Sequence, residues 1–456
     1  MKHANENHDP RLNTTSQPLN HQHQISNRQG LTALSPMLVL VGLMVGLSLW
    51  FHDFYKVPLA VIFVATAVVA LFTLRGMSLN DRIAVFSRGA GDQDLMLMLW
   101  IFVLAGAFAA SAKAMGSVDA TVNMTLSFLP AGMLLPGIFL AACVVSLSVG
   151  TSVGTIVALT PIVVGLSSQT GLDLPMLCAA TVGGAFFGDN LSFISDTTVV
   201  ATKTQGCRMS DKFRTNFFIA LPAAAVTFVL YLFIADKQPV PAITPQSVDW
   251  LKVLPYAIVL LTAVMGMNVL VVLLLGIVLT GIIGLSTDSY ALDGWFSAMK
   301  SGISDMSETI LIALLAGGLL AVIRYGGGID WIIQRLTRRV SGRRGAELSI
   351  ALLVSLVNFC TANNTVAILS VGTIARDISR RFGVDPRRAA SILDTFSCCI
   401  QGIIPYGAQL LIASGLASIP ATMMMPYLYY PYLLGLSALI AILIWTGKRR
   451  PKAIIN

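Results

Sequence analysis

The sequence predicts an all-α polytopic membrane protein with two inverted-topology repeats, each with about five crossings plus a re-entrant hairpin and with broken helices at mid-membrane. Three observations support this: the chain is poor in charge, motifs recur at one spacing, and matched loops differ in charge. Of the 456 residues, 55% are apolar and 11% are charged, whereas a soluble domain has roughly 25% charged residues. Such a chain cannot cover itself with a polar surface and must lie in lipid.

The chain divides into four segments. Residues 1–32 are polar and rich in Asn, Gln and His, without an apolar stretch, so we expect a disordered cytoplasmic tail and not a signal peptide. Residues 33–235 and 250–446 hold the two transmembrane repeats, and residues 447–456 form a short cytoplasmic tail. A membrane helix needs about 20 residues. The long apolar runs are Met37–Phe51, Val57–Leu74, Leu95–Ala112, Phe217–Ala235, Val269–Leu285, Ile310–Ile323 and Leu428–Trp445.

The two repeats are recognised by motifs that recur in order at nearly one offset. Asp94–Gly106 resembles Asp305–Gly317 at an offset of 211 residues. The sequence "GSVD" at Gly116–Asp119 matches "GGID" at Gly327–Asp330 at the same offset. Each match is weak by itself, but their agreement predicts an internal duplication.

Loop charge predicts that the second repeat is inverted relative to the first. Gly116–Pro130 has no Lys or Arg, whereas its counterpart Tyr325–Ala346 is rich in Arg. Thr170–Leu174 has no basic residue either, whereas the matched loop contains Arg376, Arg380, Arg381, Arg387 and Arg388. Under the positive-inside rule, matched loops then lie on opposite sides. We expect both termini to be cytoplasmic and the protein to lie in the inner (plasma) membrane.

Each repeat contains a hairpin with a polar tip. The hairpins lie near Gly132–Gln169 and Ala346–Ser379, with tips "VGTSVGT" and "CTANNT". Irregular backbone at membrane depth is tolerated only where protein or water satisfies it, and broken helices direct free backbone groups at a bound ion. The alternative is a helix-packing surface of small residues, but matched positions favour a site. The candidate tip residues are Thr151, Ser152, Thr155, Asn363, Asn364 and Thr365.

A second polar island, "GDNLSFISDTTVV" at Gly188–Val200, follows the first hairpin and contains Asp189 and Asp196. A carboxylate at the bilayer centre costs at least ~2.5 kcal/mol, so we expect these acids to be functional. Asp196 has the alternative of capping a helix at the interface. Gln401 is matched to Asp189 at an offset of 212 residues and lies in the polar segment "QGIIPYGAQ".

Two further acids remain candidates. Asp394 either serves the site or pairs with a loop arginine. Glu308 begins the second Ala-Gly span, where its counterpart in the first repeat is Leu97. Because an apolar residue stands at the matched place, we expect Glu308 to belong to the site.

These residue types suit cation transport and not catalysis. The chain has no P-loop, HExxH or GxSxG motif, and no ATP-binding domain, so transport must use an ion gradient. The basic residues cluster in short loops, which indicates membrane orientation and not nucleic-acid binding. Carboxylate, hydroxyl and amide oxygens suit Na⁺, which we place at Asp189 and Asp196. A buried carboxylate that holds either a proton or Na⁺ would give Na⁺/H⁺ exchange, with no cofactor beyond the transported ions.

The segment at Gly188 resembles the NhaC family of Na⁺/H⁺ antiporters, whose pattern is roughly G-D-K-x-S-P-x-S-D-T, and the resemblance extends over residues 35–446. Asn190 stands in place of the family's Lys, and Phe193 in place of its Pro. The resemblance implies a scaffold domain, a moving transport domain with two hairpins, and a homodimer. It also implies a cation site with the Asn363–Asn364 tip and Asp189, Ser192, Ser195, Asp196 and Thr197, and we add Asn190 to these candidates. Some relatives move organic acids or amino acids, so a Na⁺-coupled transporter of such a solute is the alternative function.

Overall fold

The computed structural model describes residues 25–51, 59–193, 195–235, 247–337 and 340–445, and their regular secondary structure is entirely helical. Residues 1–24 and 447–456, in the expected tails, lie outside the described residues. The first helix begins at Asn27, before residue 33, which is the expected start of the first repeat.

The described residues of the first half form ten α-helices and one short 3₁₀ helix, η3, with the following bounds. They are α1 Asn27–Phe51, α2 Leu59–Thr73, α3 Leu79–Ala90, α4 Gln93–Met115, α5 Ser117–Phe128, η3 Ala131–Met133, α6 Leu134–Val149, α7 Ser152–Thr170, α8 Leu174–Leu191, α9 Asp196–Gln205 and α10 Met209–Ala235.

The second half repeats this order of helices. Its elements are α11 Trp250–Val264, α12 Val269–Ser286, α13 Leu292–Asp305, α14 Ser307–Tyr325, α15 Gly328–Thr337, α16 Gly342–Thr361, α17 Asn364–Phe382, α18 Pro386–Gln401, α19 Ala408–Ala417, α20 Ala421–Met424, η4 Met425–Tyr427 and α21 Tyr429–Trp445.

The duplication is visible in the backbone, because residues with a positive φ recur at an offset of 211 or 212. These residues end helices or form turns, where the left-handed conformation redirects the chain. The matched pairs are Gly76 and Asp288, Gly116 and Gly327, Gly150 and Ala362, Gly171 and Gly383, and Gly206 and Ser418. The halves therefore share one backbone plan. The inversion of one half relative to the membrane remains a prediction from loop charge.

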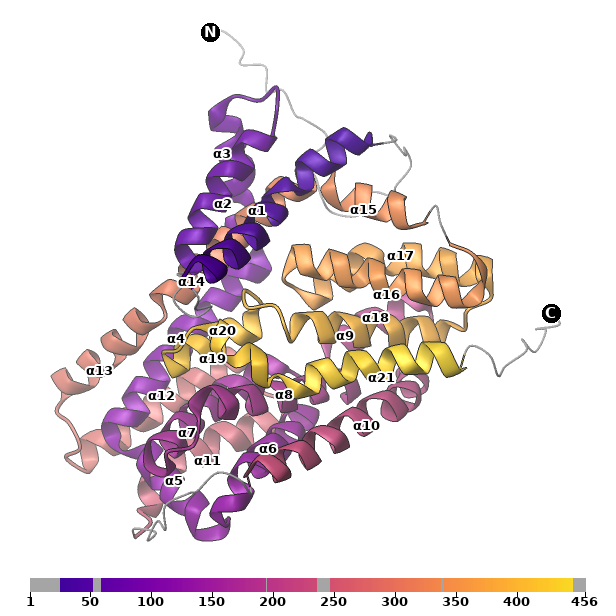
Figure 1. Cartoon of the computed structure of the whole chain (residues 1–456). Coiled ribbons are helices and arrows are strands. Elements are labelled where there is room, and N and C mark those ends of the chain that lie inside the picture. Colours follow the sequence, from indigo (N-terminus) through magenta and orange to yellow (C-terminus); the bar gives the residue numbers. More distant parts are fainter. Residues whose placement is uncertain (1–24, 52–58, 194, 236–246, 338–339, 446–456) are drawn as a thin grey trace, which may run out of the picture.

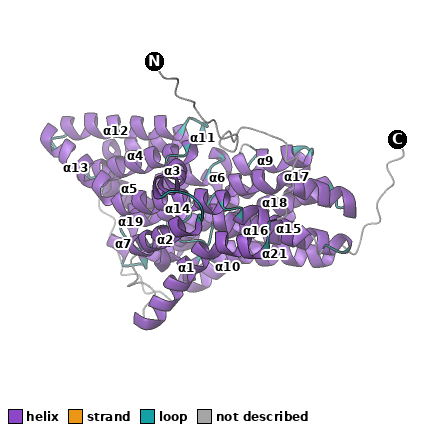
Figure 2. Cartoon of the chain, turned by 90° about the horizontal axis from the view of Figure 1, so that it is seen from above, coloured by secondary structure: helices purple, strands orange, loops and turns teal. Residues whose placement is uncertain are grey.

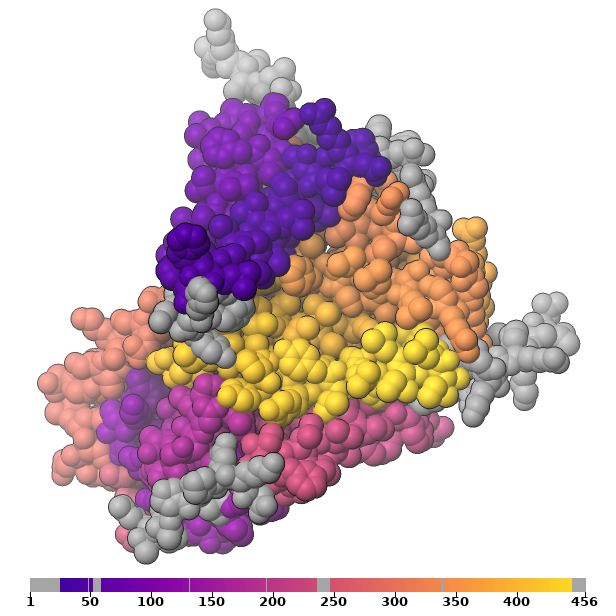
Figure 3. Space-filling model, in the orientation of Figure 1, coloured from indigo at the N-terminus to yellow at the C-terminus, as the bar shows by residue number. Residues whose placement is uncertain are grey.

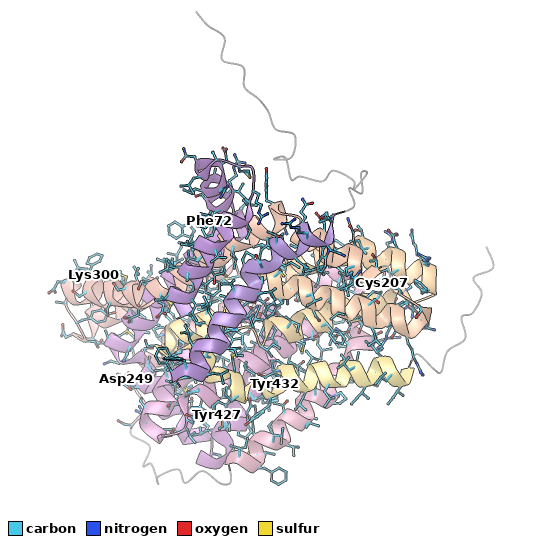
Figure 4. The ribbon with its side chains drawn as sticks, turned by 45° about the horizontal axis from the view of Figure 1, so that its top comes forward. Phe72, Cys207, Asp249, Lys300, Tyr427 and Tyr432 are labelled. Carbon is cyan, nitrogen blue, oxygen red and sulfur yellow. The ribbon has the colours of Figure 1, made fainter. Side chains whose placement is uncertain are left out.

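The chain is a multi-pass membrane protein. Among the described residues, eight helices are long and apolar enough to cross a membrane, or up to nine if α19 with α20 and η4, bent by 105°, counts as one span. Large apolar side chains are exposed on the outside, such as Phe72 at 67% and Trp50 at 79%. Figure 4 shows Phe72 and Lys300 on outlying helices, away from the centre of the molecule. An exposed apolar exterior of this kind suits contact with lipid.

Helices of the two halves are interleaved. α3 packs against α14, and α4 packs against α13. The second crossing depends on Gly106 and Gly302, because a Cβ atom on either would overlap the backbone carbonyl of the other. Small residues of this kind let membrane helices approach closely. The space-filling view shows segments of both halves in contact over the visible face (Figure 3).

The hairpins and broken helices cross from one half to the other. α6 and α7 form the first hairpin and α16 and α17 the second, which confirms two helices around each polar tip. The chain breaks between α8 and α9, and again between α18 and α19. α9 packs against α17, and α19 packs against α7, as both ribbon views show (Figures 1 and 2). Each broken helix thus meets the hairpin of the other half.

Candidate functional site

Asp189 lies at the tip of the first hairpin. Its side chain is only 5% exposed, and its Oδ1 accepts a hydrogen bond of 3.0 Å from the backbone N–H of Ser152. Ser152 is the first residue of α7, where backbone N–H groups lack partners within the helix. The positive end of the helix dipole therefore faces the carboxylate. This contact places the Asp189 carboxyl group beside the irregular backbone of the first tip.

A chain of side-chain amides joins this carboxylate to the second hairpin. Gln409 Nε2 donates to Ser152 Oγ over 3.0 Å, and Gln401 Nε2 donates to Gln409 Oε1 over 3.0 Å. Gln401 Nε2 also donates to the carbonyl of Ala362, 2.9 Å away, at the second tip. The two tips and the second broken helix are thus connected through hydrogen bonds.

Hydroxyl groups line the break between α8 and α9. The Ser195 and Thr197 hydroxyls are 2.9 Å apart and hydrogen-bonded. Thr197 Oγ1 also donates to the carbonyl of Asp189, 3.4 Å away. That carbonyl belongs to the last turn of α8, whose carbonyls lack intrahelical partners. The break therefore gathers carboxylate, carbonyl and hydroxyl oxygens, which are the donors that hard cations prefer.

A cavity of about 960 Å³ brings most of the predicted site residues together. It is bounded by both hairpin tips, by the break between α8 and α9, and by the break between α18 and α19. The predicted residues in its wall are Thr151, Ser152, Asp189, Ser195, Asp196, Thr197, Asn363, Asn364, Thr365 and Gln401. Asp196 differs from Asp189 because its side chain is exposed at the start of α9.

Five predicted residues lie outside the wall of this cavity. Thr155 is buried one turn into α7, where its hydroxyl donates to the carbonyl of Thr151 over 3.2 Å. Ser192, the cap of α8, is buried. Glu308 is exposed in the first turn of α14. The other two, Asn190 and Asp394, are buried in a neighbouring polar cluster.

That neighbouring cluster contains Lys212 and Asn216, which the sequence reasoning missed. Lys212 Nζ lies 2.8 Å from Asp394 Oδ2, with exposures of 1% and 0% for the two side chains. Asn216 Nδ2 donates to the same oxygen over 2.8 Å. Lys212 stands among other basic residues at the start of α10, so the charge pattern indicated a loop. Lys212 and Asn216 are four residues apart and so share one face of a helix. This spacing was the sequence feature that could have indicated a buried polar pair.

The cavity has a second group of charges that the sequence did not predict as part of a site. Arg88 in the last turn of α3 and Arg324 in the last turn of α14 contribute to its wall. Asp92 and Asp94 lie in the same wall. A cavity of this size, with guanidinium groups in its wall, has room for more than a bare ion.

Comparisons with known proteins identify a family and several related transporters. The family model described as "Na+/H+ antiporter family" matches residues 9–235 and 246–448. A "Malate-2H(+)/Na(+)-lactate antiporter" of Bacillus subtilis (strain 168) is 20% identical, over 92% of this chain and 96% of the relative. The "Na(+)/H(+) antiporter NhaC" of the same organism is 24% identical, over 79% of this chain and 85% of the relative.

Two further similarities extend the range of relatives. The "Arginine/ornithine antiporter ArcD" of Halobacterium salinarum is 23% identical, over 73% of this chain and 75% of the relative. The crystal structure of the Alcanivorax borkumensis YdaH transporter aligns with 90% of this chain and 98% of that one, at 14% identity and a TM-score of 0.40. With a family model that matches nearly its whole length, the chain belongs to the Na⁺/H⁺ antiporter family.

Proposed function

We propose that the chain is a secondary active transporter that exchanges Na⁺ for H⁺ by alternating access, with Asp189 as the group that binds each ion in turn. The observation that carries the proposal is the position of Asp189. Its buried carboxylate meets the helix N-terminus at Ser152 and contributes to the wall of the cavity between the two hairpin tips.

The physical argument rests on the free energy of a buried charge. An ionised carboxylate away from water is costly without a compensating positive charge. One N–H group and a helix dipole compensate in part, and a Na⁺ ion or a proton compensates fully. Asp189 can hold only one of these at a time, so binding of one ion promotes release of the other. The hydroxyls of Ser195 and Thr197 would supply further oxygens to Na⁺.

The contacts between the halves support alternating access. The hairpin tips are connected through Gln401 and Gln409, which belong to α18 and α19. Movement of this connected unit past α3, α4, α13 and α14 would carry the site from one side to the other. We further propose that the protein is a homodimer in the plasma membrane, with both termini in the cytoplasm.

A second candidate function is Na⁺-coupled transport of an organic acid or amino acid. The observation that favours it is the cavity of about 960 Å³ with Arg88 and Arg324 in its wall. Arginine binds carboxylate groups in a bidentate manner. Two of the relatives carry the names of a malate and lactate antiporter and an arginine and ornithine antiporter.

The test is Na⁺-driven proton movement in everted vesicles that contain the chain. We expect Asp189→Asn, which preserves shape but removes the charge, to abolish the signal to the background level. Asp119→Asn is the matched control, because Asp119 is exposed, and should retain wild-type activity. Full activity of Asp189→Asn would refute the proposal. Counterflow with dicarboxylates and amino acids forms the second arm, and saturation by such a solute would favour the second candidate.

A further inference from the structure

The buried cluster at Lys212 has the geometry of an occupied cation site. The Lys212 Nζ lies 2.8 Å from Asp394 Oδ2, 2.8 Å from the Asn190 carbonyl and 2.6 Å from Thr198 Oγ1. An ammonium group has three donors, and here each of them meets one oxygen. The three oxygens come from α18, α8 and α9, on both sides of the break after Asp189.

The surrounding atoms resemble an ion site more than an ordinary ion pair. A carboxylate, a backbone carbonyl and a hydroxyl are the oxygen donors that hard cations prefer. In addition, the Oδ1 atoms of Asn190 and Asn216 are buried without a hydrogen-bond partner among the described residues. Buried oxygens without partners are rare in folded proteins and call for an explanation. Ligation of a cation by these two Oδ1 atoms would explain why they lack a partner.

We propose that Asp394, Thr198 and the Asn190 carbonyl form a second cation site, which the Lys212 ammonium occupies and thereby closes to Na⁺. The chain then binds Na⁺ only at Asp189, because Asp394 already has a resident positive charge. The second site is argued from its own geometry, whereas the statement that Na⁺ binds only at Asp189 rests on the proposed function.

A purely structural ion pair is the competing explanation, and the two differ when the lysine is removed. Burial of an ion pair costs desolvation energy, so an apolar replacement of both partners is often tolerated, whereas loss of one partner leaves a costly unpaired charge. If the cluster is a cation site, Na⁺ should replace the missing ammonium. If it is only structural, added Na⁺ should not restore stability.

The experiment measures melting temperature and bound ²²Na⁺ on the purified full-length chain at constant ionic strength, with choline as the replacement cation. All variants carry Asp189→Asn, so that the first site is silent. We expect Lys212→Met to bind about one Na⁺ and its melting temperature to rise by roughly 5 °C or more at saturating Na⁺. The Asp189→Asn chain with Lys212 intact should bind none. The matched control Lys212→Met with Asp394→Asn should also bind none.

The outcomes separate cleanly. Lys212→Gln is the second variant, because it retains a donor for Asp394 without the charge, and it should also gain Na⁺ binding. If neither variant binds Na⁺, or if neither folds even at high Na⁺, the cluster is a structural ion pair and the proposal is overturned. Failure of the proposed function has a different mark: the wild-type chain, with Asp189 and Lys212 both intact, would bind no Na⁺.

Discussion

Asp189 in α8 and Gln401 in α18 stand at matched positions of the two halves, and each contacts the hairpin tip of its own half. Asp189 accepts a hydrogen bond from the first residue of α7. Gln401 instead donates to the carbonyl of Ala362, which ends α16. One half therefore presents a helix N-terminus to a negative charge, and the other presents a helix C-terminus to an amide donor. The backbone is repeated, but its polarity at the site is opposite.

A second comparison concerns the helix crossing behind each tip. Ser146 Oγ donates to the carbonyl of Ala185 over 2.5 Å in the first half. Asn358 Nδ2 donates to the carbonyl of Ser397 over 2.7 Å in the second, at matched positions. The longer amide side chain spans a wider crossing, where Ile400 takes the place of Gly188. The repeat thus preserves the hydrogen bond while it changes the spacing of the helices, and the tight crossing carries the carboxylate.

The largest expected effect comes from filling the tight crossing. In Gly188→Ala the new Cβ would overlap the backbone and side chain of Ser146, and backbone cannot yield cheaply. We expect a loss of about 3 kcal/mol in unfolding free energy, together with loss of transport, measured by thermal melting in detergent and by vesicle assay. Gly46→Ala is the control, because a Cβ there meets nothing within 4 Å. Equal melting temperatures for both variants would show that the crossing at Gly188 is not tight.

The sequence predicted the features that local patterns encode. The hairpin tips follow from small and polar residues inside apolar runs, and the match of Asp189 with Gln401 follows from the offset of the repeats. The cost of a charge at membrane depth led to the hypothesis that Asp189 is functional, and the structure places its buried side chain beside the first tip. The family resemblance rests on the same short segment.

Other features depend on residues that are distant in sequence. The hydrogen bond from Gln409 to Ser152 joins positions separated by 257 residues, and no local pattern encodes it. Lys212 lies near Arg208 and Arg214 in the sequence, and a lysine near other basic residues usually remains in water. Asp196 and Asp189 are both acids in one polar island, but a break of the helix between them exposes one and buries the other. Orientation at such a break depends on packing and not on composition.

An intermediate effect should follow from cutting the link between the halves. Gln409→Leu removes the donor to Ser152 and the acceptor for Gln401. A buried hydrogen bond contributes about 1 kcal/mol, and groups left unsatisfied add to the loss. We therefore expect roughly a 10-fold rise in the Na⁺ concentration for half-maximal exchange, measured in vesicles with the fold intact. Gln169→Leu, which loses only an exposed contact with Asp119, is the control. An unchanged Na⁺ dependence would mean that the tips act independently.

The smallest effect tests the two hairpin tips against each other. Gly150 and Ala362 end the first helix of each hairpin at φ values of 75° and 50°. The left-handed conformation costs a residue with a Cβ about 1–2 kcal/mol, and glycine escapes this cost. We therefore expect Gly150→Ala to lower the unfolding free energy by about 1 kcal/mol and Ala362→Gly to raise it by a similar amount. Thermal melting measures both changes as shifts in the melting temperature. Ala362→Gly removes a methyl group as well as the backbone strain. If both substitutions destabilise the chain, the packing of the Ala362 methyl group must therefore contribute more than the strain costs. Opposite shifts in melting temperature for the two variants would show that the tips share one backbone conformation. The tips would then differ only in the backbone strain of the residue that adopts it.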